Sequence, residues 1–134
     1  MAHADTGTGA RRRPLSPHIQ IYSRKINMVM SIWHRITGAA LYFGTLLLAW
    51  WLIAAATSPQ YFDFVNGLFG SLFGKLVLLG YTWALMHHML GGIRHLIWDT
   101  GRGFSLGMVD LLGWLTILCS LGLTAAIWFV VGAF

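Results

Sequence analysis

The chain has 134 residues, of which 57% are hydrophobic and only 10% are charged. This length allows one domain, and so few charges cannot cover a water-soluble globule of this size. The formal net charge of +5 does not indicate a nucleic-acid partner, because the basic residues bracket long apolar runs instead of alternating with aromatic residues. Cys119 stands alone, which excludes a disulfide or a cysteine metal site within the chain. The composition therefore predicts an all-α protein of the lipid membrane.

Residues 1–13 are small and polar and end in three arginines. They lack the apolar core of a secretory signal, so we interpret them as a mobile N-terminal tail. The tail is shorter and poorer in serine than a mitochondrial transit sequence and contains Asp5, which favours a bacterial inner (plasma) membrane over the mitochondrial inner membrane. Pro14 and Pro17 then hold the chain extended and delay the first helix. Residues 14–134 are expected to form a single transmembrane domain.

Three apolar runs predict three transmembrane helices, at about 31–56, 68–98 and 107–132. The first contains 19 uncharged residues, 38–56, and the second contains 18 between Lys75 and Arg94. The third contains 24 uncharged residues, 111–134. Turn-forming residues end the first run, so 57–66 is expected to be a short connection. Each run is long enough to cross the hydrocarbon layer.

The basic residues predict the orientation in the membrane. Eight of the nine lysines and arginines precede or open the first span or flank the connection between the second and third, and only Lys75 lies at the other side. The excess of positive charge places the N-terminus in the cytoplasm and, after three spans, the C-terminus on the far side. The start of the first span, the end of the second and the start of the third should therefore meet at the cytoplasmic face.

A polar cluster opens the first span. Ser31, His34 and Arg35 are spaced i, i+3 and i+4 on a helix, with Gly38 one turn deeper. We therefore expect a hydroxyl, an imidazole and a guanidinium to point together. A simpler interpretation makes Arg35 an anchor at the membrane interface and Ser31 a helix cap. A second cluster, in the next span, favours the functional interpretation.

The second cluster runs from His87 to Asp99. His88, Gly92, His95 and Asp99 share one stripe of a helix, and His88 lies about 10 Å deeper than His95. Ionisable groups at membrane depth usually have a function. Neutral imidazole is a good ligand of haem iron, and Gly92 would leave the helix surface flat beside a macrocycle.

Other interpretations of this cluster stay open. His88 could instead form a hydrogen bond to a neighbouring helix. The ligand interpretation is favoured because cationic groups near the interface suit two haem propionates: His34, Arg35, Arg94 and His95. His87 points about 100° away from His88 and remains an alternative ligand.

These motifs carry a resemblance to a known family. The segment Arg-Pro-Leu-Ser-Pro-His at 13–18, the cluster Ser31 to Gly38, and His88 followed by Gly92-Ile93-Arg94-His95 and Asp99 occur in this order. The chain resembles the cytochrome b membrane-anchor subunits of succinate dehydrogenase (respiratory complex II), and among these the large-anchor type. The resemblance implies three helices that pack with a second small anchor into a bundle holding one haem b and a ubiquinone site beneath the iron-sulfur subunit.

The resemblance also implies roles for particular residues. His88 would be one axial ligand of the haem iron, the other ligand coming from the partner anchor. Ser31 and Arg35 would line the quinone pocket, and His34, Arg35 and His95 would lie near the haem propionates. Asp99 would deliver protons or pair with Arg94 or Arg102, and we favour the pairing. His18 would touch the iron-sulfur subunit or be an ordinary surface histidine.

The sequence thus predicts an enzyme subunit that is not catalytic alone. Electrons would pass from succinate through the iron-sulfur subunit to ubiquinone, and the FAD and iron-sulfur clusters would belong to the flavoprotein and iron-sulfur subunits, because this chain contains no framework for either. Two alternatives remain: a b-type cytochrome anchor of a fumarate reductase or another membrane dehydrogenase, and a haem-free membrane scaffold.

Overall fold

The computed structural model describes residues 16–21 and 25–132, so the predicted tail at 1–13 lies outside the described residues. A short 3-10 helix, η1 (Pro17–Ile19), precedes four α-helices. These are α1 (Ile26–Thr57), α2 (Pro59–Gly70), α3 (Leu72–Asp99) and α4 (Leu106–Val131). The described residues contain no strand, which confirms the all-α class.

Three of these helices, α1, α3 and α4, are long and apolar enough to cross a membrane. This confirms the number of predicted spans and their order. The first span begins earlier than predicted, at Ile26, after an extended Lys25. The third ends where Gly132 adopts a left-handed conformation with φ of 63°, which is typical of a helix C-terminus.

The prediction for the connection at 57–66 was wrong. Only Ser58 interrupts the helices there, and α2 then runs on to Gly70. The hydroxyl of Ser58 accepts a hydrogen bond from the backbone N–H of Tyr61 at 3.3 Å, and Pro59 occupies the first turn of the new helix. Proline stops a preceding helix but also suits the first turn of the next one, and this second property decides the structure here.

A second break, at Ser71, separates α2 from α3. The extended Ser71 caps α3 by accepting a hydrogen bond from the N–H of Gly74 at 3.1 Å. Gly74 lies so close to the backbone of Leu68 and Phe69 that a side chain would not fit. The predicted continuous helix from 68 is therefore two helices joined at a tight corner.

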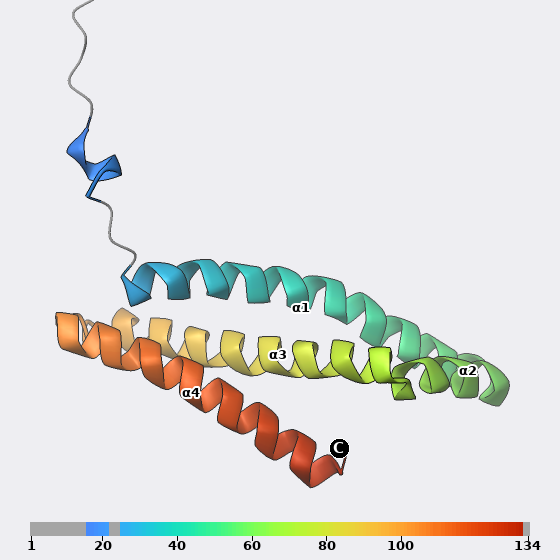
Figure 1. The fold of residues 1–134 in the computed structure, drawn as a ribbon. Helices are drawn as coiled ribbons and strands as arrows, with labels where there is room; N and C mark the ends of the chain where they lie inside the picture. Colours follow the sequence, from blue (N-terminus) through green and yellow to red (C-terminus); the bar gives the residue numbers. More distant parts are fainter. Residues whose placement is uncertain (1–15, 22–24, 133–134) are drawn as a thin grey trace, which may run out of the picture.

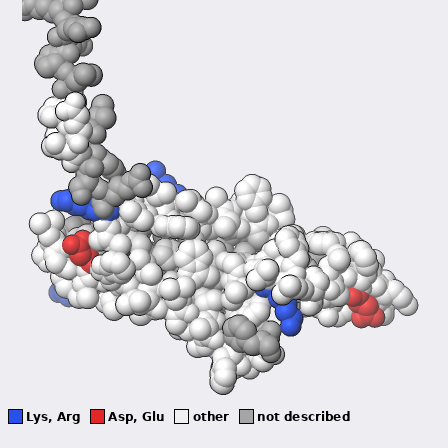
Figure 2. Space-filling view, in the orientation of Figure 1, with Lys and Arg blue, Asp and Glu red and all other residues white. Residues whose placement is uncertain are grey.

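The helix α3 lies at the centre of the molecule, with α1 and α4 packed against it (Figure 1). The start of α1, the end of α3 and the start of α4 lie at the same end, as predicted, and α4 diverges from α3 toward the C-terminus (Figure 1). In Figure 2 basic side chains gather at this end beside an acidic patch, and a further basic patch lies toward the opposite end. We call the first of these ends the basic end of the bundle.

The packing of the spans is typical of a protein surrounded by apolar material. In the most apolar stretch of each span only 11% to 17% of the residues are buried, and many large hydrophobic side chains face outward. Several buried side chains are instead polar: Thr37, His87, Arg94, Thr116, Ser120 and Thr124. Small and polar residues between helices are what membrane bundles use, because lipid or partner helices cover their apolar outer faces.

Candidate functional site

His88 lies on the side of α3 that faces α1 and is partly buried. Its Nδ1 atom is 3.1 Å from the backbone carbonyl oxygen of His34 and 3.4 Å from the hydroxyl oxygen of Thr37. The Thr37 hydroxyl lies within 2.9 Å and 3.0 Å of the carbonyl oxygens of Trp33 and His34, to which it can donate its own proton. Because a carbonyl oxygen only accepts, Nδ1 of His88 carries the proton. The lone pair of Nε2 is then available to a metal.

Two glycines make room around His88. A Cβ atom on Gly38 of α1 would lie only 3.0 Å from Cε1 of His88, so the glycine lets the imidazole approach α1 closely. Gly92, one turn from His88, has open space where its side chain would be. The flat helix surface predicted beside His88 is therefore present.

The imidazole of His34 packs against that of His88. Their ring centroids are 4.0 Å apart with an interplanar angle of 10°, and the centroid of His95 lies 5.3 Å from that of His34. Gly91 of α3 allows this approach, because any side chain there would collide with the His34 ring. The structure thus brings together His34, His88 and His95, three of the predicted site residues.

Ser31 and Arg35 do not join these histidines. Both side chains are exposed, whereas His34 is partly buried against α3, so the prediction that all three polar groups point together was wrong. The reason is that neighbours at i and i+1 differ by about 100° around a helix, which turns Arg35 away when His34 faces α3. Spaced i and i+4 on α1, Ser31 and Arg35 form an exposed pair at the basic end.

His95 and Asp99 are exposed at the end of α3. The ring of His95 contacts Trp98 edge to face, with centroids 5.2 Å apart. Within the described residues, Asp99 makes no ion pair with Arg94 or Arg102, so the favoured pairing was wrong. His18, which follows Pro17 in η1, is also exposed.

His87 has a very different environment from His88. It is 2% exposed, and its Nδ1 atom is 3.3 Å from the hydroxyl oxygen of Ser120 on α4. The Ser120 hydroxyl donates to the carbonyl oxygen of Ile117 at 2.9 Å, so it accepts from His87. The Nε2 atom of His87 is buried and makes no hydrogen bond within the described part of the chain.

Arg94 shares the face of α3 that carries His87 and is also 2% exposed. The centre of its guanidinium lies 5.0 Å from the centroid of the Trp98 ring. Thus Arg94 does not sit with the exposed cations of the basic end, where the sequence interpretation had placed it. The seven-residue spacing from His87 is the sequence signal for a shared face. Ser120 on α4 was not among the predicted site residues.

The structure therefore divides the polar residues of α3 into two stripes. The outer stripe comprises His88, Gly92, His95 and Asp99, which are partly or fully exposed. The inner stripe comprises His87, Gly91, Arg94 and Trp98, of which the first three are buried. Among the described residues, no three His, Cys, Asp or Glu side chains converge to hold a bare metal ion. His88 is thus a candidate ligand for a metal whose other ligands come from elsewhere.

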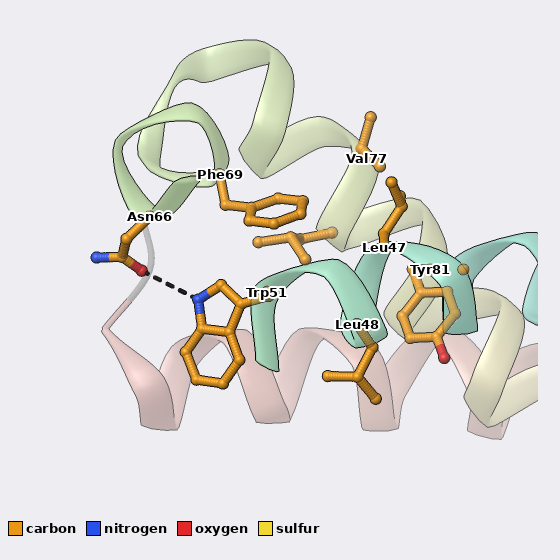
Figure 3. A pocket seen from close by; sticks show the side chains of 9 residues that line it. Leu47, Leu48, Trp51, Asn66, Phe69, Val77 and Tyr81 are labelled. Atoms are coloured by element: carbon orange, nitrogen blue, oxygen red, sulfur yellow. Dashed lines mark hydrogen bonds between the residues drawn. The ribbon is translucent and has the colours of Figure 1, made fainter. Parts of the chain in front are cut away.

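An apolar cavity of about 370 Å³ lies at the end away from the polar residues, between α1, α2 and α3 (Figure 3). Its one polar contact joins the indole N–H of Trp51 to the side-chain oxygen of Asn66 at 3.5 Å (Figure 3). Tyr81 lies so close to Gly44 that a side chain at Gly44 would not fit. None of the predicted site residues lines this cavity, so it is separate from the histidine cluster.

Three helices apolar enough to cross a membrane, with a histidine cluster at one end, define a class: helical membrane proteins with polar groups between their helices. Residues 9–131 match the family described as succinate dehydrogenase/fumarate reductase transmembrane subunit. The chain belongs to this family, as a cytochrome b membrane-anchor subunit of complex II.

Named relatives agree with this assignment. The succinate dehydrogenase cytochrome b556 subunit of Rickettsia felis is 42% identical over 117 residues, which cover 87% of this chain and 91% of the relative. That of Paracoccus denitrificans is 45% identical, over 77% of this chain and 78% of the relative. The mitochondrial succinate dehydrogenase cytochrome b560 subunit of Homo sapiens is 40% identical, over 84% of this chain and 70% of the relative. The resemblance predicted from the sequence is confirmed, and the chain is part of a membrane-bound oxidoreductase complex.

Proposed function

We propose that this chain anchors the succinate-oxidising subunits in the membrane, binds one haem b together with a second anchor subunit, and forms part of the site where ubiquinone is reduced. The observation that carries the proposal is the hydrogen bond from Nδ1 of His88 to the carbonyl oxygen of His34. Histidines that bind metals commonly donate their other ring N–H to a carbonyl in this way, which fixes the tautomer and the ring direction.

The residues around His88 fit a haem. The bound group would supply a carrier for one electron, and His88 would be its axial ligand from this chain. His34 and His95, whose centroids are 5.3 Å apart, and the exposed Arg35 would contact the propionates at the basic end. These side chains can donate hydrogen bonds to carboxylates, and Arg35 adds a permanent positive charge.

His87 fits the ligand role less well than His88. Its Nδ1 atom is engaged by Ser120, and its Nε2 atom is buried inside the chain. A macrocycle could reach that atom only if α3 and α4 separated. This contrast supports the choice of His88, and the second axial ligand would come from the partner anchor.

Ser31 and Arg35 are proposed to contact the quinone. They are exposed neighbours on α1, available to a site shared with other subunits. A serine hydroxyl can donate a hydrogen bond to a quinone carbonyl oxygen, and an arginine can stabilise the negative charge that develops as the quinone accepts an electron. Protons would come from the cytoplasm, because the excess of basic residues places the basic end there. Bacterial relatives favour the bacterial inner membrane as the location.

This assignment also divides the chemistry between the subunits. The chain does not oxidise succinate; the flavoprotein subunit with its FAD and the iron-sulfur subunit with its clusters would deliver the electrons. The family description includes fumarate reductase as well, so a b-type anchor serving fumarate reduction is the second candidate. A purified complex that keeps its haem but lacks succinate to quinone activity would favour that candidate.

One experiment tests the whole proposal. A tagged chain is purified with its partners, the partners are identified, and reduced-minus-oxidised spectra are recorded with succinate and then dithionite as donor. We expect a b-type band, quinone reduction by succinate, and co-purification of a second anchor with the two soluble subunits. A dithionite-reduced complex without a b-type band would reject haem binding and favour a haem-free scaffold.

A further inference from the structure

Arg94 is a buried cation whose charge no carboxylate of the described residues compensates. It is 2% exposed, and its Nε and Nη1 atoms are buried without a hydrogen-bond partner in that part of the chain. Among the described residues, its guanidinium makes a cation–π contact with the ring of Trp98. An arginine keeps its proton in proteins, so the positive charge remains. Buried polar groups normally find a partner, and those of Arg94 require one.

The inner stripe also contains a hydrogen-bond acceptor that suits the donors of Arg94. His87 precedes Arg94 by seven residues, about two helical turns, on the same side of α3. Its Nδ1 atom donates to Ser120, so the unpartnered Nε2 atom carries a lone pair. The inner stripe thus contains guanidinium donors and, about two turns away, an imidazole acceptor.

A second unpartnered donor lies beside the same imidazole. The indole N–H of Trp83 is buried without a hydrogen-bond partner in the described residues, and the ring of Trp83 lies 5.2 Å from that of His87. Water can accept from Arg94 and Trp83 and donate to Nε2 of His87, whereas an apolar group can do neither. Buried water typically makes about three such hydrogen bonds. These unpartnered donors and the unpartnered acceptor therefore match water as a ligand.

We propose that His87, Trp83 and Arg94 hold ordered water inside the inner stripe, and that the hydrated charge of Arg94 raises the reduction potential of a haem bound to His88. The second part rests on the proposed haem function. Arg94 and His88 are six residues apart on one helix, about 9 Å along its axis. A fixed positive charge in a poorly polarisable interior stabilises the extra electron of the reduced haem, and salt screens it little.

The test compares charge variants of the purified complex by redox titration of the haem band. Arg94→Gln removes the charge and keeps hydrogen-bond donors, so at the midpoint of the unmodified complex the ratio of reduced to oxidised haem should fall about tenfold, a shift of 59 mV for one electron. Arg94→Lys keeps the charge and should shift the midpoint much less. Lys75→Gln removes a charge from the opposite end of the same helix and should leave the midpoint unchanged.

The outcomes separate this proposal from the function it rests on. An Arg94→Gln complex with full haem content and an unshifted midpoint would overturn the electrostatic role while leaving haem binding intact. A b-type band that survives His88→Ala would instead overturn the assignment of His88 as the haem ligand. High-resolution density of the unmodified complex tests the water directly and needs no variant: we expect water between Nε2 of His87 and the guanidinium. A carboxylate of the haem or of a partner subunit bound to Arg94 in place of water would overturn the hydrated site.

Discussion

The two stripes of α3 contain similar residue types and have opposite surroundings. The outer stripe presents His88, His95 and Asp99 toward α1 and the exterior, while the inner stripe buries His87 and Arg94. A rotation of about 100° between consecutive residues separates the two environments. The comparison teaches that on a membrane helix the direction of a histidine, more than its depth, decides whether it is available to a partner or belongs to the interior.

The largest difference in haem content should separate the alanine variants of the two adjacent histidines. His88→Ala should abolish or strongly reduce the b-type band, because it removes the proposed axial ligand, whose tautomer α1 fixes. His87→Ala should retain most of the haem, because it removes a side chain of the interior. The haem content of each variant is measured from reduced-minus-oxidised spectra normalised to the amount of complex. Greater haem loss in the His87 variant would reverse our assignment of the two stripes.

The next largest effect should be a loss of quinone reduction when Ser31 or Arg35, the exposed pair on α1, is replaced. Ser31→Ala or Arg35→Ala should lower succinate to quinone activity about a hundredfold if the site relies on that donor or charge. Succinate oxidation with an artificial acceptor should persist, because the proposed function assigns the flavin to another subunit. Lys75→Ala, which removes a charge at the far end, serves as the matched control. Equal loss of both activities would point to a role in assembly.

The two adjacent glycines should also differ. Gly91→Ala introduces a methyl group where the ring of His34 lies, and such overpacking costs about 1 to 3 kcal/mol of stability. Gly92→Ala meets open space within this chain, so it should disturb the haem spectrum more than the stability. Thermal unfolding and spectra of both purified complexes decide this. A stable Gly91→Ala complex would show that His34 can leave α3 without cost.

The smallest effect should come from the hydrogen bond that ties the inner stripe to α4. Ser120→Ala removes the acceptor for Nδ1 of His87, and hydrogen bonds between membrane helices contribute about 0.6 kcal/mol on average. We expect a slight decrease in thermal stability and an unchanged haem band. Thr45→Ala, at an exposed hydroxyl of α1, is the control. A loss of haem in Ser120→Ala would mean that the inner stripe supports the ligand more directly than its geometry indicates.

Much of the fold could be predicted because it depends on the lengths of apolar runs and the positions of charges. The connection at 57–66 could not be predicted because Pro59 is compatible with the end of one helix and the start of another, and here it occupies the first turn of α2. The direction of His88 could be predicted from its spacing to Gly92 and His95. These features are local or periodic, so a single chain reveals them.

The inner stripe could not be predicted because its partners lie on a different helix. Arg94 near a membrane boundary has the pattern of an interfacial anchor, and only the packing of the helices buries it. Polar residues of α4 do recur at helical spacing, at Thr116, Ser120 and Thr124, and this stripe in an apolar span was the available signal. For Ser31 and Arg35 the spacing was misleading. It suggested that they point the same way as His34, but His34 packs against α3 while Ser31 and Arg35 are exposed.

The hydrogen bond between His88 and the backbone of α1 has a consequence for biogenesis. The carbonyl oxygen of His34 belongs to one helix and the proposed iron ligand to another, so the ligand acquires a fixed direction only after the two helices have docked. A group that binds only the docked form stabilises it by mass action. Haem capture would then act as quality control during insertion, retaining chains whose first and second spans are correctly paired and leaving mispaired chains without their cofactor.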